Sequence, residues 1–171
     1  MKQFVSILVF ILLGFGSFSQ SRLATEFQKS LKLTQQAWDY SQQVAGYFSL
    51  YNGAADLEEI KYHSFDALTG MDSLYVYAKK AEFQATDASY SAKEFNQPAI
   101  SRQAEQAAGY LRLAGQSLLE TQNKLNLIFD ETVYSSVAIQ INQALDLFSD
   151  TRKQLKMAER ELKLAIKSIG N

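Results

Sequence analysis

Cysteine is absent from this chain of 171 residues, proline occurs once and glycine eight times. Without cysteine the chain cannot form disulfides, iron–sulfur clusters or thiolate zinc sites, and it has no thiol nucleophile. The scarcity of proline and glycine excludes collagen-like and Pro-rich chains, and also a β-sandwich, whose turns recur about every ten residues. The formal net charge of −1 lacks the basic excess typical of nucleic-acid binding, so nucleic acid is not an expected partner.

The first 19 residues have the three regions of a secretory signal peptide. Lys2 supplies a positive charge, residues 4–16 are uncharged and mostly apolar, and Ser17-Phe18-Ser19 fits a small-x-small cleavage site. The apolar stretch of 13 residues is shorter than the ~20 needed to cross a bilayer, so we expect cleavage and no stable membrane span. A lipoprotein anchor is excluded because it needs a cysteine. We predict a signal peptide over residues 1–19 and a periplasmic or secreted location.

Residues 20–171 are expected to form a single domain. Removing Lys2 with the signal peptide leaves 16 basic side chains against 18 acidic ones, a net charge of −2. A domain of this size can bury about 68–70% of its unfolded surface, so it needs no disulfide for stability.

Heptad patterns predict an all-α, antiparallel up-down-up-down four-helix bundle with coiled-coil-like, alanine-rich seams. Apolar residues recur at alternating spacings of three and four in four segments, approximately 22–51, 54–96, 98–131 and 135–169. The seam of the fourth segment comprises Val137, Ile141, Ala144, Phe148, Thr151, Leu155, Ala158, Leu162, Ala165 and Ile169. The seam of the third comprises Ile100, Ala104, Ala107, Leu111, Ala114, Leu118, Thr121, Leu125 and Ile128.

The second segment has the longest seam. Its members are Leu57, Ile60, Ser64, Ala67, Met71, Leu74, Ala78, Ala81, Ala85, Ala88, Ala92 and Phe95. Alanines in 81–88 are expected to face the small residues of 107–114, which predicts a closely spaced helix pair. We also expect a kink or short break near residues 63–70, where Ser64 or Thr69 could cap a new helix.

The first segment has a less regular stripe. Its members are Leu23, Phe27, Leu31, Thr34, Trp38, Ser41, Ala45 and Phe48, with Val44 beside them. Ser30, Thr34 and Ser41 are polar seam positions of this helix. We expect Trp38 to lie in the core, near residues 67–70, where little side-chain volume is present.

Turn residues mark the ends of the predicted helices. Asn52-Gly53 is expected to stop the first helix in the left-handed conformation. Pro98 suits the first position of the third helix, because its missing N–H has no partner there. Ser135 and Ser136 offer a cap for the fourth helix.

No residue pattern predicts catalysis or a cofactor. The single histidine, His63, could share a helix face with Glu59 and Asp66 and ligate a divalent metal. The Glu-x-x-His motif of di-iron bundles is absent, however, so we prefer a surface histidine near a helix end. No serine lies in a G-x-S-x-G turn, and phosphate-binding glycine loops are absent as well. The chain is therefore expected not to be an enzyme.

Aromatic residues should gather at one end of the bundle, where the first and third turns meet. Two interpretations are open: the rings close the bundle end, or they bind a partner or ligand, since tyrosine combines an apolar ring with a polar tip. The candidate site residues are Tyr47, Tyr51, Tyr62, His63, Phe65 and Tyr134. The basic run from Arg152 to Lys167 is expected to be a solvated face, with Glu159 and Lys163 forming an i,i+4 pair.

Three functional classes follow from these patterns. The favoured one is an exported noncatalytic interaction or structural protein of the bacterial cell envelope, holding an unknown envelope protein. The second is a small-ligand-binding or sensor-like bundle, and the third is a periplasmic holdase-type chaperone, which the net charge of −2 fits poorly. A monomer is preferred, with a homodimer through an outer helix face as the alternative.

Overall fold

The chain folds into four long helices. The computed structural model describes the backbone of residues 2–169 and the side chains of residues 20–169. The helices are α1 (Lys2–Leu50), α2 (Leu57–Glu94), α3 (Pro98–Ile128) and α4 (Tyr134–Ile169), with a 3-10 turn η1 (Tyr51–Gly53) after α1. The predicted signal peptide, residues 1–19, lies outside the residues whose side chains are described. Within the described part, no helical stretch has the length and apolarity needed to span a membrane.

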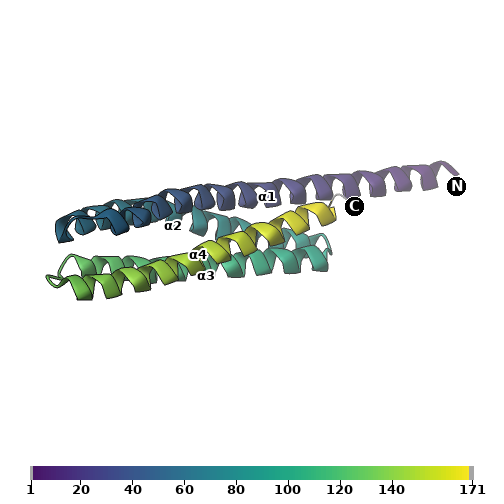
Figure 1. Cartoon of the computed structure of the whole chain (residues 1–171). Helices are drawn as coiled ribbons and strands as arrows, with labels where there is room; N and C mark the ends of the chain where they lie inside the picture. The colour runs from purple at the N-terminus through teal and green to yellow at the C-terminus, as the bar shows by residue number, and fades with distance from the viewer. Residues whose placement is uncertain (1, 170–171) are drawn as a thin grey trace.

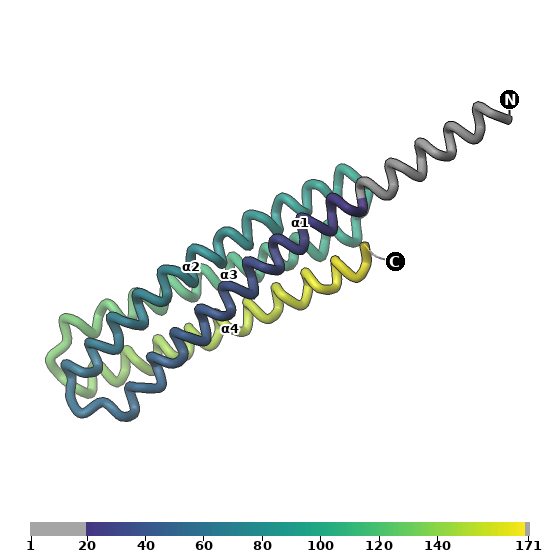
Figure 2. The backbone as a smooth tube through the Cα atoms, turned by 90° about the horizontal axis from the view of Figure 1, so that it is seen from above, coloured from purple at the N-terminus to yellow at the C-terminus, as the bar shows by residue number. Residues whose placement is uncertain are grey.

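The helices form a ring in chain order (Figure 1). Helices α1 and α3 each pack against both α2 and α4, whereas contacts across the diagonals are few. The α1–α2 and α3–α4 turns lie together at one end, which we call the two-turn end, and the α2–α3 turn lies at the other (Figure 2). This arrangement confirms the prediction of an all-α four-helix bundle.

Three of the four predicted seams form the core as expected. Every predicted seam residue of α3 and α4 is buried, and so is every one of α2 except Leu57 and Phe95, which are half-buried at its ends. Alternating spacings of three and four keep these side chains on one face of each helix, so the seams meet along the bundle axis.

The alanine-rich part of α2 packs against α3. Nε of Arg112 on α3 donates to Glu82 on α2 over 2.9 Å, and the hydroxyl oxygens of Ser89 and Ser101 lie 3.1 Å apart. The seam alanines of residues 81–88 are fully buried. Short side chains on both helices allow this approach.

The core face of α1 includes the predicted polar seam residue Ser30, and it lies one residue earlier than the predicted apolar stripe at three positions. Buried there are Ser30, Ala37 and Val44, in place of Leu31, Trp38 and Ala45, which are half-buried beside the core. One hydrogen bond accounts for the difference at the first position, since Oγ of Ser30 donates to the carbonyl oxygen of Ala81 over 3.0 Å. Small side chains therefore face α2, and the larger ones flank them.

The predicted break in the second helix is wrong, because α2 runs without interruption through residues 63–70. Ser64 and Thr69 do not cap a new helix. Their hydroxyls donate to the carbonyl oxygens of Ile60 and Phe65, one turn earlier, over 2.8 and 3.0 Å. Such bonds satisfy a hydroxyl inside a continuous helix.

The α1–α2 turn also differs from the prediction. No glycine among the described residues has a positive φ, so Gly53 ends the 3-10 turn without the left-handed conformation expected for it. Asp56 then caps α2 by accepting from the N–H of Glu59 over 2.9 Å, and the Glu59 carboxylate accepts from the N–H of Ala55 over 2.6 Å. These reciprocal bonds resemble a capping box.

The α2–α3 turn contains the left-handed residue instead. Asn96 has a φ of 54°, and the N–H of Gln97 donates back to the carbonyl of Ala92 over 2.8 Å, as in a Schellman motif. Pro98 begins α3, as predicted.

The ends of α3 and α4 are shifted slightly from their predicted positions. Helix α3 ends at Ile128, before the predicted end at residue 131. Helix α4 begins at Tyr134, so Ser135 and Ser136 lie inside its first turn and do not precede it as caps.

Candidate functional site

The six predicted site residues share the two-turn end but have different surroundings. Tyr51 is buried, Tyr47 and His63 are half-buried, and the exposed members are Tyr62, Phe65 and Tyr134. The ring of Tyr62 packs edge-on against His63, with 5.8 Å between ring centroids. A ring atom of Tyr47 lies 3.8 Å from where a Cβ on Gly70 would be. These aromatic side chains therefore do not form one common site.

Tyr51 is part of the core. Its hydroxyl lies 3.1 Å from Oγ of Ser64, and its ring meets Phe48 edge-on at 5.5 Å between centroids. Burial raises the pKa of Tyr51 to about 12, although the hydrogen bond with Ser64 opposes this shift. The phenol is consequently neutral across the physiological pH range.

His63 contacts only one of the two acids predicted to share its face. Its Nε2 lies 3.8 Å from a carboxylate oxygen of Glu59. Among the residues with described side chains, no three His, Cys, Asp or Glu residues gather closely enough to hold a metal ion, so Asp66 does not complete a ligand set.

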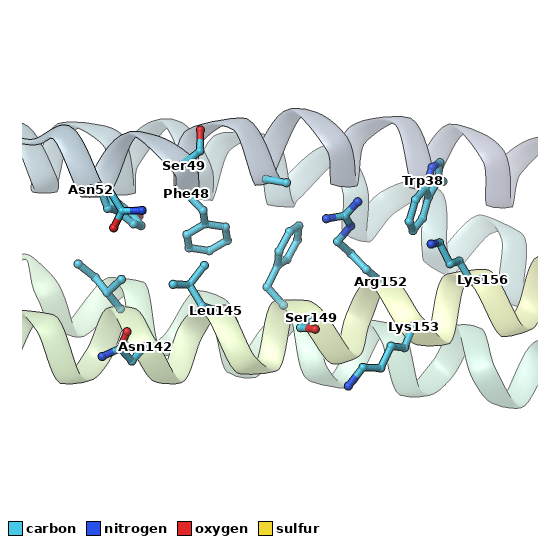
Figure 3. Close-up of a pocket in the computed structure, with 14 residues that line it drawn as sticks. Trp38, Phe48, Ser49, Asn52, Asn142, Leu145, Ser149, Arg152, Lys153 and Lys156 are labelled. Atoms are coloured by element: carbon cyan, nitrogen blue, oxygen red, sulfur yellow. The ribbon is translucent and has the colours of Figure 1, made fainter.

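A groove between α1 and α4 opens at the two-turn end (Figure 3). Its volume is about 590 Å³, and 14 residues from α1, η1 and α4 line it. The rings of Phe48 and Phe148 meet across it with centroids 5.1 Å apart. Ile141 and Leu145 extend this apolar surface toward the end of the bundle. Among adjacent helices, α1 and α4 make the least contact, and Figure 1 shows α4 approaching α1 toward the opposite end.

Trp38 lies at the inner end of this groove, and its predicted place in the core is wrong. The indole is half-buried between two cations of α4: Cζ of Arg152 lies 4.9 Å and Nζ of Lys156 lies 4.8 Å from a ring centroid. The space beside Gly70 is instead filled by Val44, whose Cγ2 would lie 2.9 Å from a Cβ on that glycine. Cation–π attraction therefore holds Trp38 toward α4.

The groove is positively charged at this end. Arg152 donates from Nη2 to Gln42 over 2.9 Å, while its Nε is buried without a hydrogen-bond partner. Lys153 points away from the groove in Figure 3 and pairs with Asp150 at 2.9 Å. No carboxylate is among the 14 lining residues. The Arg152 and Lys156 charges are thus uncompensated within the groove.

Comparison with protein-family models, curated proteins and solved structures finds no match to this chain. The function must therefore be inferred from the geometry of the groove.

The sequence patterns did not predict this groove. Of the predicted site residues only Tyr51 lines it, and the basic run from Arg152 was predicted to be a solvated face. That prediction is confirmed for the pair of Glu159 and Lys163, whose charged atoms lie 2.7 Å apart. The available signal was the spacing of Arg152 and Lys156, which places two cations one turn apart on α4.

Proposed function

We propose that this chain is an exported, noncatalytic binding protein whose α1/α4 groove holds an anionic amphiphile, meaning an apolar chain with a negatively charged head. One observation carries the proposal: an apolar floor and a pair of uncompensated cations share one groove. This favours the ligand-binding class among the three that the sequence left open. Export rests on the signal-peptide pattern of residues 1–19.

The apolar part of the groove suits a hydrocarbon chain. Phe48, Phe148, Ile141 and Leu145 offer a continuous surface without an ionised group. Pockets for small ligands range from about 300 to 1,000 Å³, and the volume of about 590 Å³ lies inside that range. Burying each methylene group of such a chain contributes ~0.8 kcal/mol.

The basic end of the groove suits the head of the ligand. A carboxylate or phosphate beside Trp38 would accept hydrogen bonds from the guanidinium of Arg152 and the ammonium of Lys156, which both lie close to the indole ring. Hydrogen bonds to charged groups contribute ~1.5–3 kcal/mol each. A cationic head at this place would meet two like charges.

The side chains of the groove support the noncatalytic part of the proposal. His63, the single histidine of the chain, lies on α2 outside the groove lining, so the groove has no imidazole. Tyr51, the one phenol in the lining, has its pKa raised to about 12.

The test uses Trp38, which is the only tryptophan in the chain. The full chain is titrated with dodecanoate and, separately, with dodecyltrimethylammonium, both below their critical micelle concentrations, while tryptophan fluorescence is recorded. We expect a saturable change with dodecanoate only. Equal responses to the two probes, or no response to dodecanoate, would contradict the proposal.

A pair of variants links binding to the groove. Arg152→Gln should weaken dodecanoate binding about tenfold, the equivalent of ~1.4 kcal/mol. Lys167→Gln makes the same change of charge on α4 at a residue outside the groove lining, and it should leave the dissociation constant within about twofold. Equal weakening in both variants would indicate general attraction to a basic helix and not a site.

A further inference from the structure

The outer face of α2 carries a second heptad pattern that the core does not use. Its residues recur every seven positions, and we name them the α2 outer stripe: Tyr62, Thr69, Val76, Phe83 and Tyr90. All five are exposed, and three rings are largely so, at 70% for Phe83, 64% for Tyr62 and 61% for Tyr90.

The stripe lies opposite the core seam of the same helix. Each member follows a buried seam residue by two positions, as Tyr62 follows Ile60, which places it about 200° around the helix. The corresponding positions on the other helices are mostly small, polar or charged. They are Thr25, Lys32, Asp39 and Gly46 on α1, Arg102, Gly109, Gln116 and Asn123 on α3, and Ile139, Asp146, Lys153, Arg160 and Lys167 on α4. Isolated exposed apolar residues are ordinary, but a regular row on one helix indicates a contact surface.

We propose that the α2 outer stripe pairs two copies of this chain through antiparallel packing of their α2 helices. A spacing of seven residues is the period that keeps one row of side chains facing a second helix along its length. The stripe is also suited to a two-fold axis at Val76. Such an axis brings Tyr62 level with Tyr90 of the second copy and Thr69 level with Phe83, so the same surface serves both copies.

Charges beside the stripe select the antiparallel direction. Asp72 lies four residues before Val76 and Lys80 four residues after it. Neither makes an ion pair within the described chain: Asp72 accepts from Gln122 over 2.9 Å, and Nζ of Lys80 lies over the Tyr77 ring at 5.5 Å. In an antiparallel pair Asp72 comes level with Lys80 of the second copy, twice by symmetry. A parallel pair would bring like charges level with each other.

This pairing is independent of ligand binding. Helix α2 contributes no residue to the lining of the α1/α4 groove, so the groove stays accessible in the dimer. The proposal replaces the monomer preferred from the sequence by its alternative, a homodimer through an outer helix face.

Sedimentation equilibrium of the full chain tests the pairing. We expect a dimer at micromolar concentrations, and Phe83→Glu should raise its dissociation constant at least tenfold because it places a carboxylate in the stripe. Gln116→Glu is the matched control at the corresponding outer position of α3, and it should not change the constant. A wild-type chain that stays monomeric up to about 100 µM would overturn the proposal.

Charge exchange tests the role of Asp72 and Lys80. Asp72→Lys should weaken the dimer severalfold, because it sets lysines level with each other, and Lys80→Asp should weaken it in the same way. The chain with both substitutions restores opposite charges and should regain the wild-type dissociation constant. A double variant as weak as either single one would refute this antiparallel alignment.

Disulfide trapping tests whether the two α2 helices pair antiparallel or parallel. No other thiol competes with an introduced cysteine, because the chain has no cysteine of its own. Val76→Cys should form a covalent dimer on mild oxidation, since the two-fold axis brings the two thiols together. Tyr62→Cys should not, because its counterpart lies about 42 Å away in an antiparallel pair. Efficient cross-linking of Tyr62→Cys would show a parallel pair and overturn the proposal.

Discussion

The α2–α3 and α1–α4 contacts join neighbouring helices of one bundle, yet the space left beside them differs more than twofold in volume. Between α2 and α3, buried alanines allow Ser89 and Ser101 to lie 3.1 Å apart and Arg112 to reach Glu82 at 2.9 Å. Between α1 and α4, aromatic residues occupy the two-turn end and a groove of about 590 Å³ remains beside them.

The difference shows how side-chain size decides where a bundle opens. The groove that remains between the alanine seams of α2 and α3 is about 260 Å³, less than half the volume of the α1/α4 groove, where the larger rings of Phe48 and Phe148 meet. The groove is therefore a consequence of bulky residues at one end of one helix pair. Replacing a small residue by a large one should therefore destabilise the α2–α3 contact more than the α1–α4 contact.

Ala85→Leu should have the largest effect on stability. Ala85 is fully buried in the α2 seam, and a leucine there must push the helices apart, at a cost of about 1–3 kcal/mol. The matched control is Ala45→Leu, which adds the same atoms at a half-buried position that lines the groove, and it should change stability by less than about 0.5 kcal/mol. Urea unfolding measures both. Equal costs would show that the two contacts are equally close-packed.

Tyr51 should make the stability of the folded chain fall at alkaline pH. Because burial raises the pKa of Tyr51 from 10.0 to about 12, the unfolded chain loses this proton at a lower pH than the folded chain. The stabilising contribution is complete below pH 10 and is lost as pH rises toward 12, by about 1.4 kcal/mol per pH unit. Tyr51→Phe removes this slope, so urea unfolding at pH 9, 10 and 11 should show the two stability curves converging or crossing. If the unfolding free energies of the wild type and Tyr51→Phe change in parallel with pH, the Tyr51 phenol is not shielded from solvent in the folded chain.

The sequence predicts most of the fold because heptad spacing is a local signal. All seam residues of α3 and α4 are buried where the pattern places them. The pattern is ambiguous on α1, where Ser30 and Leu31 are both seam candidates, and it fails at Trp38, which outweighs Ala37 on hydrophobicity alone. The partner that draws Ser30 inward is the carbonyl of Ala81, which no pattern within α1 contains.

The groove is harder to predict for the same reason. Trp38 and Arg152 come from the first and last helices, and their contact depends on how the ring of four helices closes. The tyrosines are conspicuous in the sequence, but burial and turn geometry separate Tyr51 from Tyr62 and Tyr134. Local patterns identify which residues face inward more readily than which pairs of helix ends remain apart.

Arg112→Gln should have the smallest effect and a characteristic dependence on pH. Burial favours the neutral form of Glu82, but hydrogen bonds from Lys79 and Arg112 and their charges together lower the pKa of this carboxyl below 4.5. The stabilisation is therefore present above pH 4.5 and is lost as the pH falls through the lowered pKa.

Because the Arg112 side chain is exposed and Lys79 still pairs with Glu82, Arg112→Gln should cost less than about 1 kcal/mol at pH 7, and urea unfolding should show this cost disappearing at acid pH. Arg152→Gln is the matched control from the α1–α4 contact, where no carboxylate lines the groove. Its effect on stability should not change between neutral and acid pH. We expect this difference because only the α2–α3 contact uses a carboxylate to hold its arginine. A similar acid-dependent loss of stability in both variants would mean that the two helix contacts do not differ in their ion pairing.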